Sequence, residues 1–543
     1  MSDLVEGQRG RPVTPGPREY LAISLLPLAL VATFFILRGD AGPFWLWRPL
    51  DPSYFYLFES LNTLNLQWPG DQVVAHPGVP VYALGALVMR LLHPLTPSAD
   101  ITAMVLADPE FYLRAISTLL IFFSAGTLWI VGYFAYLTFG GMTAAAAIQM
   151  APFLSKLILK RGFLVTPETL LIPATLLLIG ITIAALREDN LERCRGYFSI
   201  AFGLSAGLGV AIKLTAVPVF VLPLFVLLKP KEIVRYGLCA AIAFLVLTIP
   251  AWGAYDAFFS LNWQVIFQAT PDIGGSARIF GDAANVVKLL KRPVLNVPIV
   301  LSFIVFLIYL RGGGLRTAIN NLEMRTLLGI TLAQLTQVAF VAKQANSYYL
   351  NPSYMLSALS MVLALRFLAD RIRIPQSLPV TAKGVGIVLL AGVMAAQLEN
   401  VHRLDRNLAT INDRAQHVDD ATFKTCARIY TYPASGQSFA LYLADRVTGF
   451  QFSNQLKPLN PDNDFWIDDW DTSEAIFRNW DGPADAVSVV ADYPCLLFRG
   501  NRYGRIQAFL KQYAPEHAPA RSCSTPDEEI TVVGVNCQGE LTN

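Results

Sequence analysis

Apolar runs of about the length needed to cross a lipid bilayer recur over most of the chain. A transmembrane helix takes about 20 mainly apolar residues. Eleven runs approach or meet that length: Leu21–Leu37, Ala115–Phe139, Met142–Leu159, Leu170–Leu186, Tyr197–Ile212, Leu214–Leu228, Tyr236–Trp252, Val294–Leu310, Thr326–Ala342, Pro352–Phe367 and Gly384–Gln397. The pattern therefore predicts a polytopic α-helical membrane protein with about eleven spans.

One further apolar run is predicted not to span. Val79–Leu92 has only fourteen residues and carries Arg90 near its end, which is typical of an interfacial or re-entrant helix. The run belongs to a long segment, residues 38–114, part of which is rich in Trp, Tyr and Phe yet too polar for lipid. We expect this segment to lie along the membrane surface, with its aromatic rings in the headgroup layer.

The distribution of Lys and Arg predicts which side of the membrane each loop faces. An odd number of spans puts the two termini on opposite sides. With the N-terminus in the cytoplasm, the outward loops hold fewer basic residues although together they are roughly twice as long as the inward ones. In a plasma membrane of bacterial type, the outward segments are then residues 38–114, 160–169, 253–293, 343–351 and the C-terminal tail.

From residue 398 onward the composition is that of a soluble domain. Strand-like and helical patterns predict an α/β domain, with strands at Ala486–Val490, Cys495–Phe498 and Ile530–Val535 and a helix at Tyr503–Tyr513. The predicted parts are a cytoplasmic tail, a transmembrane domain and an outward soluble domain, at residues 1–20, 21–397 and 398–543.

Four of the six cysteines fall in this outward domain. In an oxidising compartment they suggest two disulfides, and three connectivities are open, among Cys426, Cys495, Cys523 and Cys537. Their spacing is not that of a zinc site.

Composition narrows the class further. The chain has 543 residues, of which 54% are hydrophobic and only 15% charged, whereas soluble proteins are about a quarter charged. A net charge of +2 without a basic stripe argues against a nucleic-acid partner. The polar tail lacks the pattern of a cleaved signal, so the first apolar run is predicted to remain as an anchor among membrane lipids.

Candidate chemistry begins in the long outer segment. Asp51, Glu59 and His76 lie there, and ionisable groups beside a membrane cavity often mark a function. Asp51 precedes Pro52, so it also fits a helix N-cap. His76 stands in His-Pro-Gly, which is typical of a sharp turn before the interfacial helix.

A second acidic candidate, Glu168, follows Thr166 and Pro167 in the next outer turn. This is also a helix-start pattern, in which Thr caps and Glu favours the first turn. Two nearby cations, Lys160 and Arg161, lie on the side where basic residues are discouraged. They either extend into the headgroups or hold the phosphate of a lipid-linked substrate.

Two later turns carry further candidates. Lys213 ends a Gly-rich helix, where glycines permit close helix packing. Lys343, Tyr348 and Tyr349 share an outward turn, where an aromatic belt and contact with phosphate or sugar are both open.

The order of these parts resembles the GT-C superfamily of membrane glycosyltransferases, in particular the protein O-mannosyltransferase and lipid A aminoarabinose transferase families. Asp51 in LDPSYFYL resembles the acidic residue of their first outer loop, and His76-Pro77-Gly78 resembles their His-Pro turn. Lys160-Arg161 with Glu168 is similar to their second acidic site, although Glu replaces the more usual Asp. The helix ending in Lys213 and the turn Lys343–Tyr349 resemble their later motifs.

The resemblance implies inverting transfer of a sugar from a polyprenyl-phosphate donor to a lipid, glycan or protein acceptor on the outer face. It implies Asp51 and Glu168 as catalytic residues. Substrate contacts would come from Glu59, His76, Lys160, Arg161, Lys213, Lys343, Tyr348 and Tyr349. The first loop lacks an Asp-Xaa-Asp pair, so a tightly bound divalent metal is doubtful and no cofactor is firmly implied.

Other classes fit less well. A transporter or flippase should show internal repeats and broken helices in two corresponding halves, and no such symmetry is evident. An O-antigen-ligase-like enzyme would carry its large loop late in the chain. An anchor for the soluble domain would need only one span.

Overall fold

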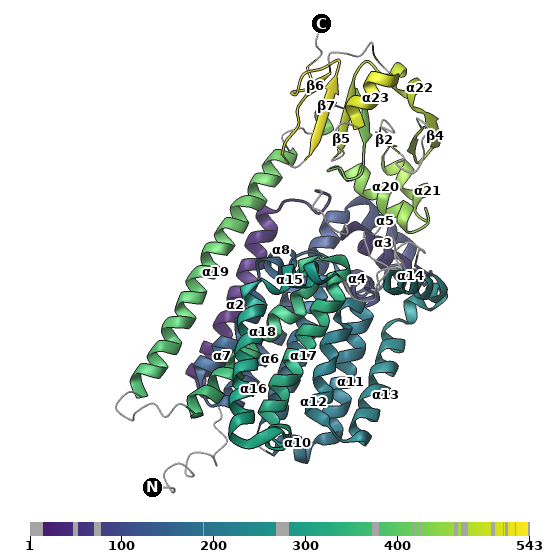
Figure 1. Ribbon diagram of the computed structural model, residues 1–543. Coiled ribbons are helices and arrows are strands. Elements are labelled where there is room, and N and C mark those ends of the chain that lie inside the picture. The colour runs from purple at the N-terminus through teal and green to yellow at the C-terminus, as the bar shows by residue number, and fades with distance from the viewer. Residues whose placement is uncertain are drawn as a thin grey trace.

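The computed structural model describes residues 15–46, 53–69, 78–187, 189–267, 282–371, 379–416, 420–423, 425–460, 465–468, 476–500, 505–513, 515, 520–526 and 528–540. Within them a helix bundle carries a sheet-containing domain at one end (Figure 1). The protein is thus a multi-pass α-helical membrane protein with a C-terminal α/β domain, as the sequence predicts.

Seven of the described helices are long and apolar enough to cross a membrane. They are α2 (Pro17–Asp40), α6 (Pro109–Phe139), α9 (Pro167–Leu186), α10–α11 (Asn190–Arg193, Arg195–Ile212), α16 (Pro293–Asn320, interrupted at Gly314), α17 (Leu322–Val341, continued by η5, Ala342–Gln344) and η6–α18 (Ser347–Leu350, Asn351–Arg371). An eighth is counted if α13 (Pro230–Leu247) and η3–α14 (Ile249–Ala254, Tyr255–Phe267), which meet at a 78° bend, form one span.

Three of the predicted spans are not continuous helices, and one of them, Tyr236–Trp252, is broken at the bend between α13 and η3. The run Met142–Leu159 is divided into α7 (Met142–Gln149), η1 (Ala151–Phe153) and α8 (Lys156–Arg161). Leu214–Leu228 begins as the 3₁₀ helix η2 (Leu214–Val221) before α12 (Leu222–Leu227). Proline explains part of this, because Pro152 and Pro218 each remove a backbone donor that a continuous helix would use.

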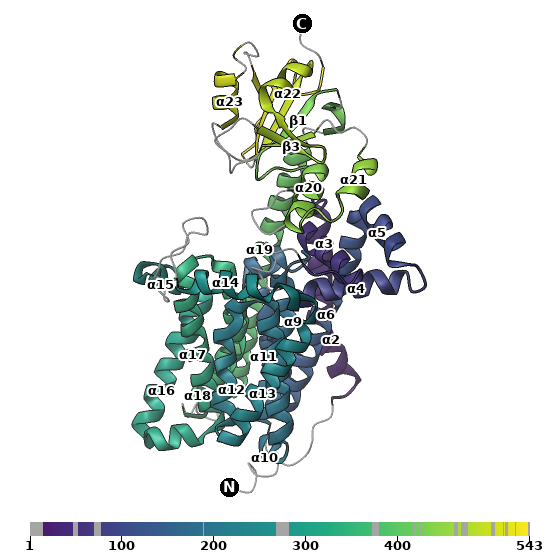
Figure 2. The ribbon, with the colours of Figure 1, turned by 90° about the vertical axis from the view of Figure 1, so that its right-hand side faces the viewer.

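The long outer segment folds into short helices at the end of the bundle that faces the soluble domain (Figure 2). These are α3 (Ser53–Leu64), α4 (Val79–Leu92) and α5 (Ser98–Ala107), joined later in the chain by α15 (Ala283–Leu290). The prediction that Val79–Leu92 is a short apolar helix, too short to count as a span, is confirmed.

Close packing between α11 and α13 explains two of the glycines. A Cβ atom on Gly203 would lie 2.7 Å from the Tyr236 carbonyl oxygen, and one on Gly207 would lie 2.6 Å from that of Ala240. Both distances are far below van der Waals contact, so a larger residue would force the two helices apart.

The helix α19 (Pro379–Gln416) runs beside α2 and continues to the soluble domain (Figure 1). The change of composition at residue 398 therefore falls inside one helix. At its far end, the carbonyl oxygen of Ala415 accepts a hydrogen bond from buried Arg499.

The soluble domain is built on a sheet of seven described strands in the order β4-β3-β2-β1-β5-β7-β6. The strands are β1 (Ala427–Tyr430), β2 (Phe465–Asp468), β3 (Ile476–Asn479), β4 (Gly482–Asp485), β5 (Leu496–Gly500), β6 (Arg521–Ser522) and β7 (Glu529–Val533). β1 pairs in parallel with β2 and β5, and the remaining pairs are antiparallel. The associated helices are η7 (Asp420–Phe423), α20 (Gln437–Val447), α21 (Ser453–Leu459), α22 (Ala486–Asp492) and α23 (Arg505–Tyr513).

The predicted strands at 495–498 and 530–535 and the helix at 503–513 are confirmed as β5, β7 and α23. The prediction of a strand at Ala486–Val490 is wrong, because these residues form α22. Asp485 caps that helix by accepting a hydrogen bond from the Ser488 backbone N–H at 2.9 Å, and this local bond favours a helix despite three β-branched valines nearby.

Two disulfides join the four cysteines of this domain, Cys426 to Cys495 and Cys523 to Cys537. The prediction of two disulfides is confirmed. Of the three connectivities that the sequence left open, the structure has the one that pairs Cys426 with Cys495 and Cys523 with Cys537.

Candidate active site

A group of charged and aromatic side chains, buried except for half-buried Tyr348, lies where four elements meet at the end of the bundle facing the soluble domain. Glu168 lies in the first turn of α9, Arg161 at the end of α8 and Lys213 at the end of α11. The turn η6 adds Tyr348 and Tyr349. We call these five residues the cationic cluster.

Glu168 is shared by the two cations. Its Oε1 atom lies 3.5 Å from an Arg161 guanidinium nitrogen and is also hydrogen-bonded to Nζ of Lys213. The three side chains expose 3%, 7% and 5% of their surface respectively. Among the described residues, one buried carboxylate thus lies between two buried cations.

The tyrosines cover the cations. The Arg161 guanidinium carbon lies 3.4 Å from the centroid of the Tyr348 ring, and Nζ of Lys213 lies 4.8 Å from that of Tyr349. Such cation–π contacts are attractive, and more strongly so where the cation is removed from water. Lys343 is buried in η5, a few residues before the same tyrosines.

Hydrogen bonds to the backbone hold the cluster in place. The Thr169 hydroxyl donates to the Arg161 carbonyl oxygen at 2.8 Å. The side-chain amide of Gln337 donates to the carbonyl oxygens of Thr215, two residues after Lys213, at 2.9 Å, and of Tyr349 at 3.1 Å. Gln337 thereby ties two turns of the cluster together from α17.

The first outer segment meets the cluster at two points. The Val165 backbone N–H, three residues before Glu168, donates to the Ser53 hydroxyl of α3 at 3.2 Å. The Gly78 N–H donates to the carbonyl oxygen of Ile212, next to Lys213, at 3.0 Å. Gly78 has φ = 71°, a left-handed conformation that favours glycine.

Asp51 and His76, two sequence-based candidates, lie outside the described residues. Their nearest described neighbours on the side toward the C-terminus are Ser53 and Gly78, the two residues with these contacts.

The other predicted site residues divide into two groups. Glu168, Arg161, Lys213, Tyr348 and Tyr349 come together in the cationic cluster. Lys160 is half-buried on α8. Glu59 is fully buried on α3 and accepts a hydrogen bond from the Asn62 amide at 3.2 Å.

Sequence reasoning missed Glu110, which fastens the start of the outer segment. This carboxylate accepts hydrogen bonds from the Phe44 N–H at 2.9 Å and the Tyr54 hydroxyl at 3.1 Å. Burial raises the pKa of the Tyr54 phenol well above its ordinary value, and the neighbouring Glu110 charge adds to the rise. Tyr54 therefore remains a protonated donor.

Among the described residues, no group of three or more His, Cys, Asp or Glu side chains is placed to hold a metal ion.

The chain matches no protein-family model and no curated protein sequence. Among solved structures it is similar to ArnT from Cupriavidus metallidurans bound to undecaprenyl phosphate. The TM-score is 0.48 with 11% identity, over 94% of this chain and 97% of that one. At these values we assign neither residue roles nor an activity to this chain from the similarity.

Proposed function

We propose that the protein is an inverting glycosyltransferase that moves a sugar from a polyprenyl-phosphate donor to an acceptor at the outer face of the membrane. The observation that carries the proposal is the cationic cluster. Ionisable groups at membrane depth are costly and usually functional. A buried pair of cations there suits a ligand that is both anionic and attached to a lipid, and a polyprenyl phosphate is such a ligand.

The cationic cluster contains positively charged groups that could bind the phosphate leaving group. Arg161 presents a guanidinium fork suited to phosphate oxygens, and Lys213 adds a point charge. Together they would stabilise the negative charge that grows on the leaving group without requiring a metal. Glu168 would hold both cations in position. Lys160 and Lys343 are further candidate contacts for the donor.

In the proposed reaction, the acceptor hydroxyl oxygen attacks C1 of the sugar and gives its proton to the Asp51 carboxylate. The new O–C1 bond forms as the bond from C1 to the phosphate oxygen breaks, and polyprenyl phosphate leaves with the electron pair. This role for Asp51 rests on the sequence, since the residue lies outside the described part of the chain.

Two variants separate donor binding from transfer. Arg161→Gln should weaken donor binding by about tenfold to a hundredfold, because a charge-assisted hydrogen bond contributes roughly 1.5–3 kcal/mol. Asp51→Asn should bind donor normally but transfer about a hundred to ten thousand times more slowly, as expected for loss of a general base. The measurements are donor affinity and single-turnover transfer from a panel of polyprenyl-phosphate sugars.

Lys288→Gln is the matched control for charge, because Lys288 is an exposed cation on α15 at the same end of the bundle. It should leave both quantities near those of the unaltered protein. An equal loss of donor affinity in Lys288→Gln and Arg161→Gln would contradict the phosphate-binding role. Near-normal transfer by Asp51→Asn would remove Asp51 as the base.

A further inference from the structure

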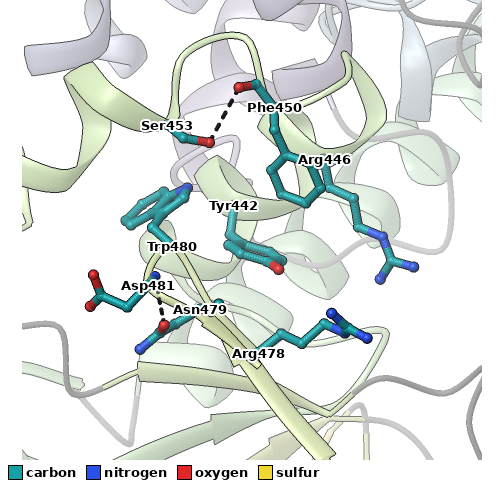
Figure 3. Close-up of a pocket in the computed structure, with 9 residues that line it drawn as sticks. Tyr442, Arg446, Phe450, Ser453, Arg478, Asn479, Trp480 and Asp481 are labelled. Carbon is teal, nitrogen blue, oxygen red and sulfur yellow. Dashed lines mark hydrogen bonds between the residues drawn. The ribbon is translucent and has the colours of Figure 1, made fainter. Parts of the chain in front are cut away.

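Two cavities in the described part of the chain differ in the chemistry of their walls. One, of about 460 Å³, lies in the soluble domain and is lined mostly by polar or charged side chains, among them Arg478, Asn479 and Asp481 (Figure 3). The other is a groove of about 390 Å³ between helices that can span the membrane, and its walls are mainly apolar. We call it the apolar groove. Its lining comes from residues 127–134 of α6, 176–184 of α9 and 190–201 of α10 and α11.

Small residues leave the space for this groove. The helix α9 packs against both α6 and α11, but Gly180 and Ala184 on α9 and Ala201 on α11 fill little of the gap between them. A Cβ atom on Gly180 would have its nearest neighbour at 3.5 Å, an ordinary contact with Val131. The position therefore has room for a larger side chain.

The apolar groove opens toward the lipid and has one polar end. Among its lining residues, Ile130 exposes 39% of its surface and Tyr197 78%. Asn190, whose amide donates to the Ala184 carbonyl oxygen at 2.8 Å, lies with Tyr197 at the end of the bundle that carries α10 (Figures 1 and 2). Tyrosine is enriched where membrane meets water, so this end suits a lipid headgroup.

The groove stays within one leaflet. Its stretch of α9, residues 176–184, rises roughly 12 Å at 1.5 Å per residue. The hydrocarbon core of a bilayer is about 30 Å thick, so the groove covers less than half of it. A ligand that enters from the α10 end thus reaches toward the middle of the membrane.

The size of the groove argues against a partner helix as its occupant. An α-helix with its side chains is about 10–12 Å across, so two turns fill roughly 800–900 Å³. That is more than twice the volume of the groove. A single hydrocarbon chain is thin enough to enter it.

The packing of α9 argues against the tail of the proposed donor. Every residue from 167 to 176 of α9 is buried, including Glu168 of the cationic cluster. A polyprenyl chain whose phosphate lies at the cluster has no exposed path along α9 to the groove. The occupant therefore enters from the other end.

We propose that the apolar groove binds one acyl chain of a phospholipid from the leaflet on the α10 side, with the headgroup beside Asn190 and Tyr197. The chain would contact α6, α9 and α11 at once and fill the space that the small residues leave. This site is separate from the cationic cluster and does not depend on the proposed reaction.

The test titrates the purified full chain in digitonin, a detergent without an alkyl chain, and counts bound lipid by native mass spectrometry. The probes are dioleoylphosphatidylcholine with two chains, palmitoyl lysophosphatidylcholine with one, glycerophosphocholine with none, and undecaprenyl phosphate. We expect saturable binding of both chain-bearing phospholipids and none of glycerophosphocholine. Undecaprenyl phosphate should not displace them. A lysophosphatidylcholine with a photoreactive group on its chain should cross-link to the three lining stretches.

Gly180→Leu places a side chain in the groove, and leucine favours a helix more than glycine does. Because the added carbons take the place of lipid methylenes, this variant should bind both phospholipids about tenfold or more weakly. Gly126→Leu is the matched control. Gly126 is exposed on α6, does not line the groove, and has no atom within 4 Å of a Cβ position, so this variant should bind like the unaltered protein.

The cross-links in the unaltered protein locate the site even if Gly180→Leu fails to fold. Absence of saturable phospholipid binding, cross-links confined to other parts of the chain, or displacement by undecaprenyl phosphate would overturn the inference. Equal lipid affinity in folded Gly180→Leu and Gly126→Leu would do the same.

Discussion

At the scale of single residues, Glu168 is the centre of the candidate active site because both buried cations depend on it. A buried ion pair contributes little compared with an apolar replacement, but removal of one partner leaves an uncompensated charge. In this cluster the loss of one carboxylate would take an ion-pair partner from two buried cations, Arg161 and Lys213.

We therefore predict that Glu168→Gln destabilises the protein by about 3–5 kcal/mol. The double variant Glu168→Gln with Lys213→Met should be more stable than Glu168→Gln alone, because the buried cation is removed together with its carboxylate partner. Thermal melting of the purified protein measures this order. Glu399→Gln serves as the control, since Glu399 pairs with Arg403 at the surface and such pairs contribute about 0–1 kcal/mol. A melting temperature for Glu168→Gln equal to that of the control would contradict the prediction.

The sequence identified the residues of the cationic cluster as candidates, but it did not predict which of them contact one another. Glu168 and Lys213 are both explained locally by helix ends, and the chain gives no direct sign that they share a hydrogen bond across 45 residues. Gln337 was missed because a single amide in an apolar helix belongs to no recognisable motif. Its polarity could still have drawn attention to it, since a strongly polar side chain inside a span needs a hydrogen-bond partner in the bundle.

At the scale of elements, the sequence patterns predicted some helices and strands correctly and others wrongly, and proline residues and helix caps account for several of the errors. The helix α23 and the strands β5 and β7 follow their periodicity. The broken segment from α7 to α8 was read as one span, since apolar composition alone does not show where a helix is interrupted. The helix α22 was read as a strand because valine favours strands, whereas its cap at Asp485 decided the outcome.

The two disulfides stabilise different elements and should differ in strength. Cys426–Cys495 closes a separation of 69 residues at the starts of the parallel strands β1 and β5, whereas Cys523–Cys537 closes only 14. In the chain-entropy model these loops correspond to about 4 and about 3 kcal/mol.

We predict that replacing Cys426 and Cys495 by Ala makes the soluble domain melt lower than replacing Cys523 and Cys537 does, with the helix bundle unaffected in both. Limited proteolysis of the full chain during heating reports the domain separately from the bundle. Cys194→Ala, which removes a cysteine outside both bridges, should leave the melting of the domain unchanged. The reverse order of the two bridge variants would show that strain or residual unfolded structure outweighs loop length.

At the scale of the whole molecule, hydropathy predicts the architecture better than it predicts the number of spans. It predicts about eleven spans, whereas seven or eight are counted among the described helices. Long apolar helices, a short apolar helix at Val79–Leu92 and a C-terminal α/β domain are all readable from the sequence. Pro152 and Pro218 account for part of the broken helices, but hydropathy reports neither these breaks nor the 78° bend after α13. The soluble domain lies at the end of the bundle opposite α10 in both views (Figures 1 and 2).

Because of that arrangement, the predicted orientation of the protein in the membrane can be tested by labelling one residue at each end of the bundle. Gln437 on α20 and Glu192 on α10 are exposed, and the two helices lie at opposite ends of the helix bundle. If basic residues keep α10 in the cytoplasm, Gln437→Cys should react with a membrane-impermeant maleimide in intact cells. Glu192→Cys should react only after the membrane is permeabilised. Both variants need Cys194 and Cys239 replaced by Ser, because these two are free. Labelling of Glu192→Cys in intact cells, with Gln437→Cys silent, would invert the topology and place the candidate active site on the cytoplasmic face, where the proposed outer-face transfer could not occur.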